Sequence, residues 1–85
     1  MNFEVLSFVT FCVGNLADAL NMSASKVYSL LRTSNILTDY IIPSYDVLHT
    51  FSKEYIIEDL IDLMQERGVL QWNYFMLQQE RRTEP

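Results

Sequence analysis

The sequence predicts an all-α fold, a compact bundle of four to five short helices, and three observations support this prediction. Apolar residues recur at intervals of three and four along most of the chain. The 85 residues include only two Gly and two Pro, fewer than a turn-rich β protein needs. Capping residues such as Ser and Gly stand at the ends of the apolar runs. A chain of this length forms one domain with one small core.

The first helix is predicted over residues 3–20, because its apolar residues follow helical spacing. They are Leu6, Val9, Val13, Leu16 and Leu20, and the stripe is widened by Phe8, Cys12 and Ala19. Gly14 costs up to about 1 kcal/mol against Ala inside a helix, so it is predicted to mark a close contact with another helix. Cys12, between Phe11 and Val13, is predicted to be a buried and unreactive thiol.

The second helix is predicted over residues 24–34, with Ser23 as its N-cap. Val27, Leu30 and Leu31 are expected to face the core. The β-branched residues of the segment 36–42 permit a strand, but its helical flanks favour a short third helix that ends near Pro43. That helix resumes in residues 44–49 in one interpretation, so one helix and two helices both stay open.

Residues 53–67 are predicted to form the next helix, with Ser52 as N-cap and Glu54 in the first turn. Gly68 is expected to stop it. Its core face comprises Ile56, Ile57, Leu60, Ile61, Leu63 and Met64. Residues 69–82 carry no helix breaker and are predicted to form a further helix. We therefore expect a helical core domain over residues 1–68 and a C-terminal helical extension over residues 69–85 with a frayed end.

The charge pattern bears on partners and on location. The formal net charge is −5, and Arg81 and Arg82 are the only adjacent bases, so neither nucleic acid nor an anionic membrane surface is expected as a partner. The apolar run 5–13 follows Glu4 without a base, which argues against a signal peptide, and it is too short for a transmembrane helix. The single Cys12 cannot form an internal disulfide. A cytoplasmic protein is therefore expected.

Several short motifs carry a resemblance to a known family. They are Tyr45-Asp46-x-Leu48-His49-Thr50, Tyr55, Glu58-Asp59-Leu60 and Arg67-Gly68, together with Phe8 to Cys12 and Ser23-x-x-Lys26-Val27-Tyr28 upstream. The chain resembles a small bacterial family of unknown function over residues 3–68. Members of that family are often encoded beside a protein that resembles ADP-ribosyltransferases. The resemblance therefore implies an antitoxin, immunity-like or adaptor partner of such a protein.

Asp46 and His49 lie three residues apart, so they share a face on a helix. A carboxylate that orients an imidazole is half of a catalytic or metal-binding pair. One His and one distant Cys are too few ligands for zinc, so no metal and no cofactor are expected. We expect His49 to be structural, with its ring buried and bonded to backbone carbonyls or to Asp46. Tyr45, Asp46, His49 and Thr50 are also candidates for contact with a partner.

Four acidic residues follow a spacing of four and predict one stripe along the helix over residues 53–67. They are Glu54, Glu58, Asp62 and Glu66. Like charges at this spacing repel, so the stripe is either a solvated face or a contact for a basic partner. Asp59 falls off the stripe and is expected to meet Tyr28, Tyr45 or a backbone N–H.

The C-terminal extension carries more apolar residues than one side of a helix can hold. They are Trp72, Tyr74, Phe75, Met76 and Leu77. Part of this set is expected to be covered by a second chain, most simply in a homodimer.

The sequence thus predicts a protein–protein interaction module that is not an enzyme. One alternative is a DNA-binding antitoxin-type regulator, in which residues 23–42 would form a helix-turn-helix. The second helix of that motif, residues 36–42, has no base to offer to DNA. A second alternative is a small enzyme that uses Asp46 and His49 with Thr50 or Ser52 as nucleophile.

Overall fold

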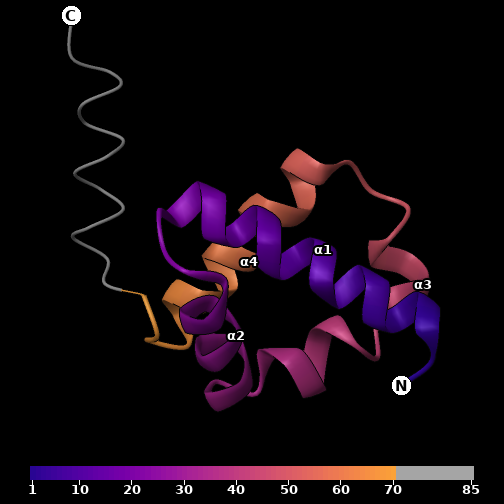
Figure 1. The fold of residues 1–85 in the computed structure, drawn as a ribbon, viewed down its shortest axis with the longest axis horizontal. Helices are drawn as coiled ribbons and strands as arrows, with labels where there is room; N and C mark the ends of the chain where they lie inside the picture. The colour runs from indigo at the N-terminus through magenta and orange to yellow at the C-terminus, as the bar shows by residue number, and fades with distance from the viewer. Residues whose placement is uncertain (71–85) are drawn as a thin grey trace, which may run out of the picture.

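Five helices make up the regular structure of residues 1–70, the part of the chain that the computed structural model describes, and no strand occurs in that part (Figure 1). They are α1 (Phe3–Leu20), α2 (Ala24–Thr33), the π-helix η1 (Leu37–Ile41), α3 (Tyr45–Leu48) and α4 (Lys53–Glu66). The predicted all-α bundle of short helices is therefore confirmed.

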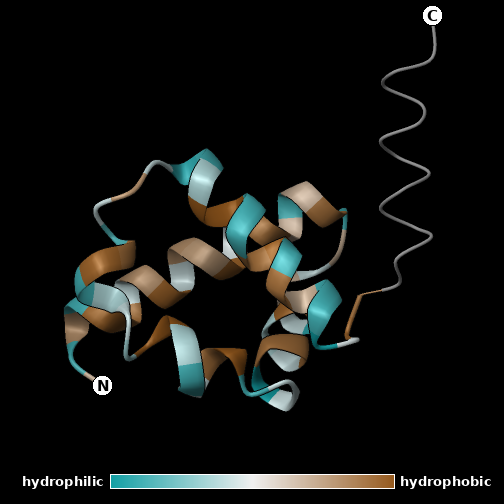
Figure 2. Cartoon of the chain, turned by 180° about the vertical axis from the view of Figure 1, so that it is seen from behind, coloured by the Kyte–Doolittle hydropathy of each residue, from teal (hydrophilic) through white to brown (hydrophobic). Residues whose placement is uncertain are grey.

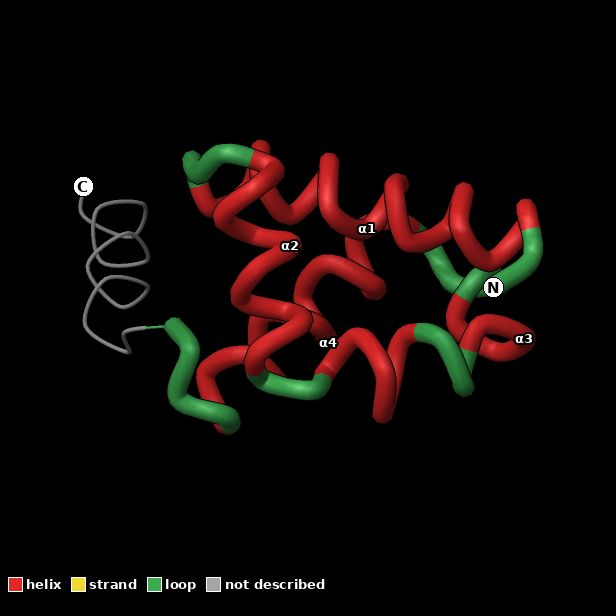
Figure 3. The backbone as a smooth tube through the Cα atoms, turned by 60° about the horizontal axis from the view of Figure 1, so that its bottom comes forward, coloured by secondary structure: helices red, strands yellow, loops and turns green. Residues whose placement is uncertain are grey.

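The long helix α1 organises the bundle by packing against both α2 and α4. Figure 3 shows α1 along one side, with α2 and α4 beneath it and the short α3 near the N-terminus. The π-helix η1 packs against α2 and leads the chain toward α3. Polar and apolar positions alternate around the helices in Figure 2, as expected for a single shared core.

The helix ends follow from short-range hydrogen bonds. The hydroxyls of Ser23 and Ser52 accept from the backbone N–H groups of Lys26 (3.1 Å) and Tyr55 (3.2 Å), as predicted for N-caps. At the other ends, Asn21 (φ 55°) and Gly68 (φ 76°) take the left-handed conformation that stops a helix. The predicted bounds of α1 are confirmed, while α2 and α4 each end one residue earlier than predicted.

The core is built mainly on one face of α1. The buried residues of α1 are Phe8, Val9, Cys12, Val13, Leu16, Ala17 and Leu20. The prediction placed Leu6 and Ala19 in the same stripe, and this is wrong: Leu6 is 51% exposed and Ala19 is exposed too. The buried face of α1 is centred on Cys12 and Leu16, which are fully buried, and Leu6 and Ala19 lie on its flanks.

The structure also differs from the expectation that Gly14 marks a close contact with another helix. Gly14 lies within α1 without breaking the helix, but a Cβ built at this position would meet nothing within 4 Å. The predicted close helix contact at Gly14 is therefore wrong for residues 1–70. Gly14 is exposed, on the flank of α1 that lines a groove with Ala24 and Tyr28 of α2.

The ambiguous segment 36–49 forms two separate helices. In η1 the N–H of Ile42 donates to the carbonyl of Leu37 at 3.1 Å, the wider i→i−5 spacing of a π-turn. Pro43 then interrupts the chain before α3, because its nitrogen has no hydrogen to donate. The π-turn places Ile36, Leu37 and Ile41 in the core.

Val69 and Leu70 end the described chain. They are half-buried and pack against the core, and their backbone is bent rather than helical. The remaining residues of the predicted C-terminal helix lie outside the described residues.

By length and composition alone, α1 is apolar enough to cross a membrane, with a mean hydropathy of 1.4 over 18 residues. The expectation from the sequence rested on the shorter apolar run 5–13, whereas the helix extends over Phe3–Leu20. In the bundle α1 supplies the centre of the core, and a third of that window is buried.

Candidate functional site

The segment from Tyr45 to Thr50 forms α3 and the turn after it. The ring of His49 lies flat on that of Tyr45, with centroids 4.5 Å apart and planes at 12°. Its Nδ1 lies 2.7 Å from the backbone carbonyl of Tyr45. A carbonyl oxygen only accepts, so Nδ1–H donates in this bond. The ring thus bonds to the backbone rather than to Asp46. Because His49 is exposed, the expectation of a buried hydrogen bond is wrong.

Four rings form a continuous aromatic ladder from α1 to α3, in the order Phe11, Phe8, Tyr45 and His49. Phe8 stacks on Phe11 at 6.2 Å and meets the edge of Tyr45 at 5.4 Å. Phe8 is 7% exposed and Phe11 is 40% exposed, so the ladder is buried at its middle and open at both ends. It fixes α3 on α1, and it presents His49 and Phe11 to the surface.

The hydroxyl groups near His49 are used locally. Thr50 donates from Oγ1 to the carbonyl of Val47 at 2.6 Å, and Ser52 caps α4. Neither hydroxyl bonds to His49, and Asp46 is exposed beside them. Among residues 1–70, no three His, Cys, Asp or Glu side chains gather as metal ligands.

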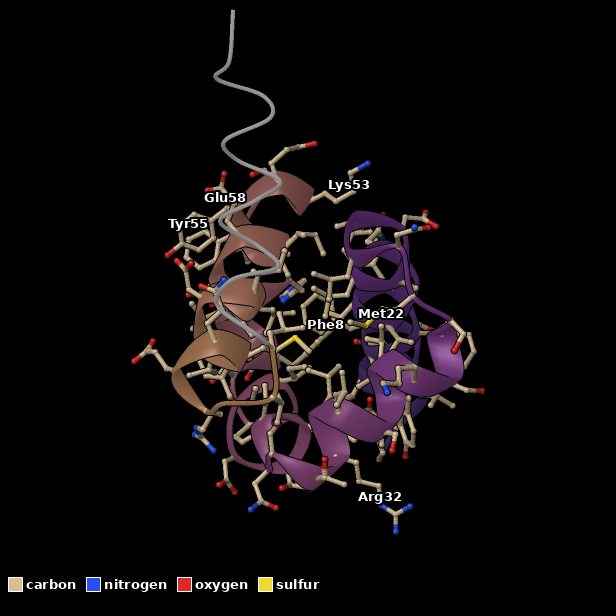
Figure 4. All side chains as sticks on the ribbon, turned by 90° about the vertical axis from the view of Figure 1, so that its left-hand side faces the viewer. Phe8, Met22, Arg32, Lys53, Tyr55 and Glu58 are labelled. Carbon is tan, nitrogen blue, oxygen red and sulfur yellow. The ribbon has the colours of Figure 1, made fainter. Side chains whose placement is uncertain are left out.

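The acidic stripe, defined as Glu54, Glu58, Asp62 and Glu66, is exposed along its whole length on α4. An exposed aromatic pair flanks its N-terminal half. The rings of Phe51 and Tyr55 lie 4.6 Å apart and are 43% and 51% exposed. Figure 4 shows Tyr55 and Glu58 together on the outer side of α4. Carboxylates and ring faces thus form one continuous surface.

Asp59 turns away from the stripe and accepts a hydrogen bond from the hydroxyl of Tyr40. The expected partners of Asp59 were Tyr28, Tyr45 or a backbone N–H, so that prediction is wrong. Tyr40 belongs to η1 and Asp59 to α4, so this bond joins the two helices. Burial, and then the hydrogen bond and charge of Asp59, raise the pKa of Tyr40 from 10.0 to about 12.

An open cleft of about 440 Å³ lies between α1 and α4, beside the stripe. Its lining comprises Asn15, Asp18, Ala19, Lys53, Glu54, Ile57 and Glu58. Figure 4 shows Lys53 at the start of α4, on the side of α1. Residue spacing contains no signal that joins Asn15 to Lys53, because the cleft depends on how the two helices cross.

Cys12 lies at the centre of the core and is fully buried. Burial raises the pKa of its thiol from 9.0 to about 12. The predicted burial is confirmed, and the environment disfavours the thiolate that would be needed for chemistry.

Residues 36–42, the second helix of the alternative helix-turn-helix, place most of their large aliphatic side chains in the core. Ile36, Leu37 and Ile41 are buried in the core, which leaves the exposed side of η1 to Thr38 and Asp39. Figure 4 shows Arg32 pointing outward from α2. Arg67 is used within the fold, since its Nη1 donates to the carbonyl of Ser34 at 2.9 Å.

The predicted self-association residues lie outside the described residues. They are Trp72, Tyr74, Phe75, Met76 and Leu77.

A family model described as a protein of unknown function, DUF3791, matches residues 7–67. The match spans most of α1, all of α2, η1 and α3, and α4 with the residue that follows it. No curated protein and no solved structure matches the chain.

Proposed function

This chain belongs to the DUF3791 family, and we propose that it is a non-enzymatic interaction module that binds a basic segment of a partner protein. One observation carries the proposal: the whole acidic stripe is exposed and is flanked by the exposed pair Phe51 and Tyr55. The binding surface in this proposal is the outer side of α4.

The energetics of the stripe favour a cationic ligand. Each pair of like charges at a spacing of four destabilises a helix by about 0.2–0.5 kcal/mol, and a bound cation relieves this repulsion. Arg side chains also stack on the faces of Tyr and Phe, which adds about 0.5–1 kcal/mol at an exposed site. The stripe supplies the charge and the aromatic pair supplies the stacking faces for such a segment.

The identity of the partner rests on the family resemblance. Because members are often encoded beside an ADP-ribosyltransferase-like protein, we propose that protein as the partner. The chain would then act as its antitoxin, as an immunity-like protein or as an adaptor. A second candidate contact surface comprises Tyr45, Asp46, His49 and Thr50. His49 ends the aromatic ladder and is exposed directly after α3.

The two alternatives have less support. A DNA-binding regulator would need a helix that enters the major groove, and η1 buries its apolar side in the core. An enzyme would need a nucleophile within reach of its base, and Thr50 bonds instead to a backbone carbonyl.

A capture experiment with three baits tests the proposal. The baits are the wild-type chain, a stripe variant with Glu58→Gln and Asp62→Gln, and a charge-matched control with Glu4→Gln and Asp39→Asn. All four positions are exposed, so the three baits should remain folded. We expect a partner that wild type and control retain and that the stripe variant loses. Equal capture by all three baits would exclude the stripe as the binding surface.

The purified partner then gives a quantitative measurement. The stripe variant should associate at least about tenfold more slowly than wild type at low salt, with a weaker dependence on ionic strength. The control should match the wild-type rate. An unchanged rate for the stripe variant would reduce the stripe to a solvated face.

A further inference from the structure

One flank of α1 carries apolar side chains that the bundle does not cover. Phe3 is 81% exposed and Leu6 is 51% exposed, although α1 is the most apolar helix by composition. An apolar groove of about 250 Å³ separates this flank from α2. Its lining carries no charged side chain and comprises Leu6, Val9, Thr10, Val13, Gly14, Ala24 and Tyr28.

The size of the residues changes along this flank. Phe3 and Leu6 are large and protrude at the N-terminal half. Gly14 is small and exposed and lies at the C-terminal half, where a Cβ built on it would meet open space. Leu6, Thr10 and Gly14 are four residues apart, so they form one ridge of the helix. When two copies of this flank pack antiparallel, the large residues of one copy face the small residues of the other.

We propose that this flank is a self-association surface, on which α1 of a second copy packs antiparallel about a two-fold axis near Thr10. Position 6 then lies opposite position 14, and position 3 lies opposite position 17. Each Leu6 would enter the space above the Gly14 of the second copy, and each Phe3 would lie over the C-terminal half of the second α1. Tyr28 would close the side of the groove.

The charge of the chain favours a second copy over a membrane as occupant. A helix that lies on an anionic membrane is rich in Lys and Arg, whereas α1 contains none. The net charge is −5, and the groove is an uncharged place where a like-charged copy can approach. Screening by salt should therefore strengthen the dimer, because it weakens the repulsion between the two copies.

The exposed area sets the expected strength. From exposed fractions of 81%, 51% and 43%, Phe3, Leu6 and Tyr28 would bury roughly 350 Å² per protomer, at about 200 Å² for each side chain. A standard interface buries about 800 Å² per partner, and the groove walls supply further apolar area. The three side chains supply less than half of that area, so a weak dimer is expected, one that forms only toward high protein concentration.

Sedimentation equilibrium of the full-length chain from about 5 to about 200 μM tests the proposal. The wild-type mass should rise from the chain mass of 10.0 kDa toward twice that value, and more steeply at about 0.5 M than at about 0.05 M NaCl. Gly14→Leu should stay monomeric while its melting temperature is kept or raised, because the new side chain enters open space. The double variant Leu6→Ala, Gly14→Leu exchanges large and small positions, and it should recover at least part of the association.

Cross-linking locates the axis. Thr10→Cys should give a disulfide-linked dimer under mild oxidation, whereas Thr38→Cys, at an exposed position of η1, should not exceed the wild-type background. A wild-type chain that stays monomeric at the highest concentration would overturn the proposal, and so would a Gly14→Leu variant that dimerises like wild type. Binding of the monomer to vesicles of phosphatidylcholine and phosphatidylglycerol, abolished by Leu6→Ala, would assign the flank to a membrane instead.

The proposed dimer and the proposed partner binding can be tested independently, because they differ in their dependence on salt and on the acidic stripe. Association through α1 strengthens with salt and is insensitive to Glu58→Gln and Asp62→Gln. Partner binding through the stripe weakens with salt and depends on those two residues.

Discussion

At the scale of single residues, a hydrogen bond contributes less to stability at the surface than beside the core. His49 bonds to a backbone carbonyl from an exposed position, whereas Tyr40 reaches Asp59 from a half-buried one. Water competes for the first bond much more than for the second. Tyr40 therefore contributes more to stability than His49, although only His49 belongs to the recognised motif.

Replacing His49 by Ala should lower the free energy of unfolding by about 0.5–1 kcal/mol, the scale of an exposed neutral hydrogen bond with a ring contact. Urea unfolding followed by circular dichroism measures the change. Asp46→Asn serves as the control and should leave stability within about 0.5 kcal/mol of wild type. A loss of several kcal/mol in His49→Ala would show that the ring is more enclosed than its exposure indicates.

Replacing Tyr40 by Phe should cost about 1–2 kcal/mol at pH 7, because a hydrogen bond to a carboxylate is lost. The pKa of Tyr40 rises from 10.0 to about 12 on folding, so its contribution is complete below pH 10 and is lost as the pH rises through 12. The difference between wild type and Tyr40→Phe should therefore shrink between these values. Exposed Tyr28→Phe should show neither effect, and a difference that persisted at pH 12 would contradict the assignment.

At the scale of elements, local signals set where the long helices begin and end. Ser23 and Ser52 were predicted as N-caps from their place before apolar runs, and both accept the expected backbone hydrogen bond. Gly68 was predicted as a stop and has the positive φ that stops a helix. Each of these helix ends depends on residues within one turn of one another, so it can be predicted from the sequence alone.

Removing a cap should have a measurable effect on α4. Ser52→Ala deletes the acceptor for the N–H of Tyr55 and should destabilise the chain by about 1 kcal/mol. Ser29→Ala is the matched control, since Ser29 is exposed in the middle of α2, where Ala is the better helix former. Urea midpoints should therefore move in opposite directions. A Ser52→Ala midpoint equal to wild type would mean that the cap contributes nothing.

At the scale of the whole molecule, contacts join residues that lie far apart in the chain, and the sequence predicts fewer of these contacts. The all-α class and most core residues of α4 follow from spacing. The bonds Tyr40–Asp59 and Arg67–Ser34 join residues 19 and 33 positions apart, and nothing in the sequence pairs them. The errors at Leu6, Ala19 and Gly14 have the same origin. Spacing identifies an apolar helix, whereas the crossing of α2 and α4 decides which side of it is buried.

Global stability can be followed through Cys12, whose thiol is fully buried and has a pKa raised to about 12. A thiol reagent should reach it only after the core opens. For a stability near 5 kcal/mol, labelling should be at least about a thousandfold slower than in urea-unfolded protein. Absorbance assays with a disulfide reagent measure both rates. Rapid labelling of the native chain would contradict the packing of α1.

The π-turn in η1 has a consequence for insertions and deletions. A π-turn holds one residue more than an α-turn, so its flanks are already arranged as if one residue had been inserted between them. Deletion of exposed Thr38 should convert η1 into an ordinary α-turn while Leu37 and Ile41 still face the core. The same deletion at Ser29 would rotate the rest of α2 by about 100° and remove Leu31 from the core. Soluble expression and thermal melting of the two deletion variants should therefore differ sharply, with the shortened η1 tolerated and the shortened α2 unfolded.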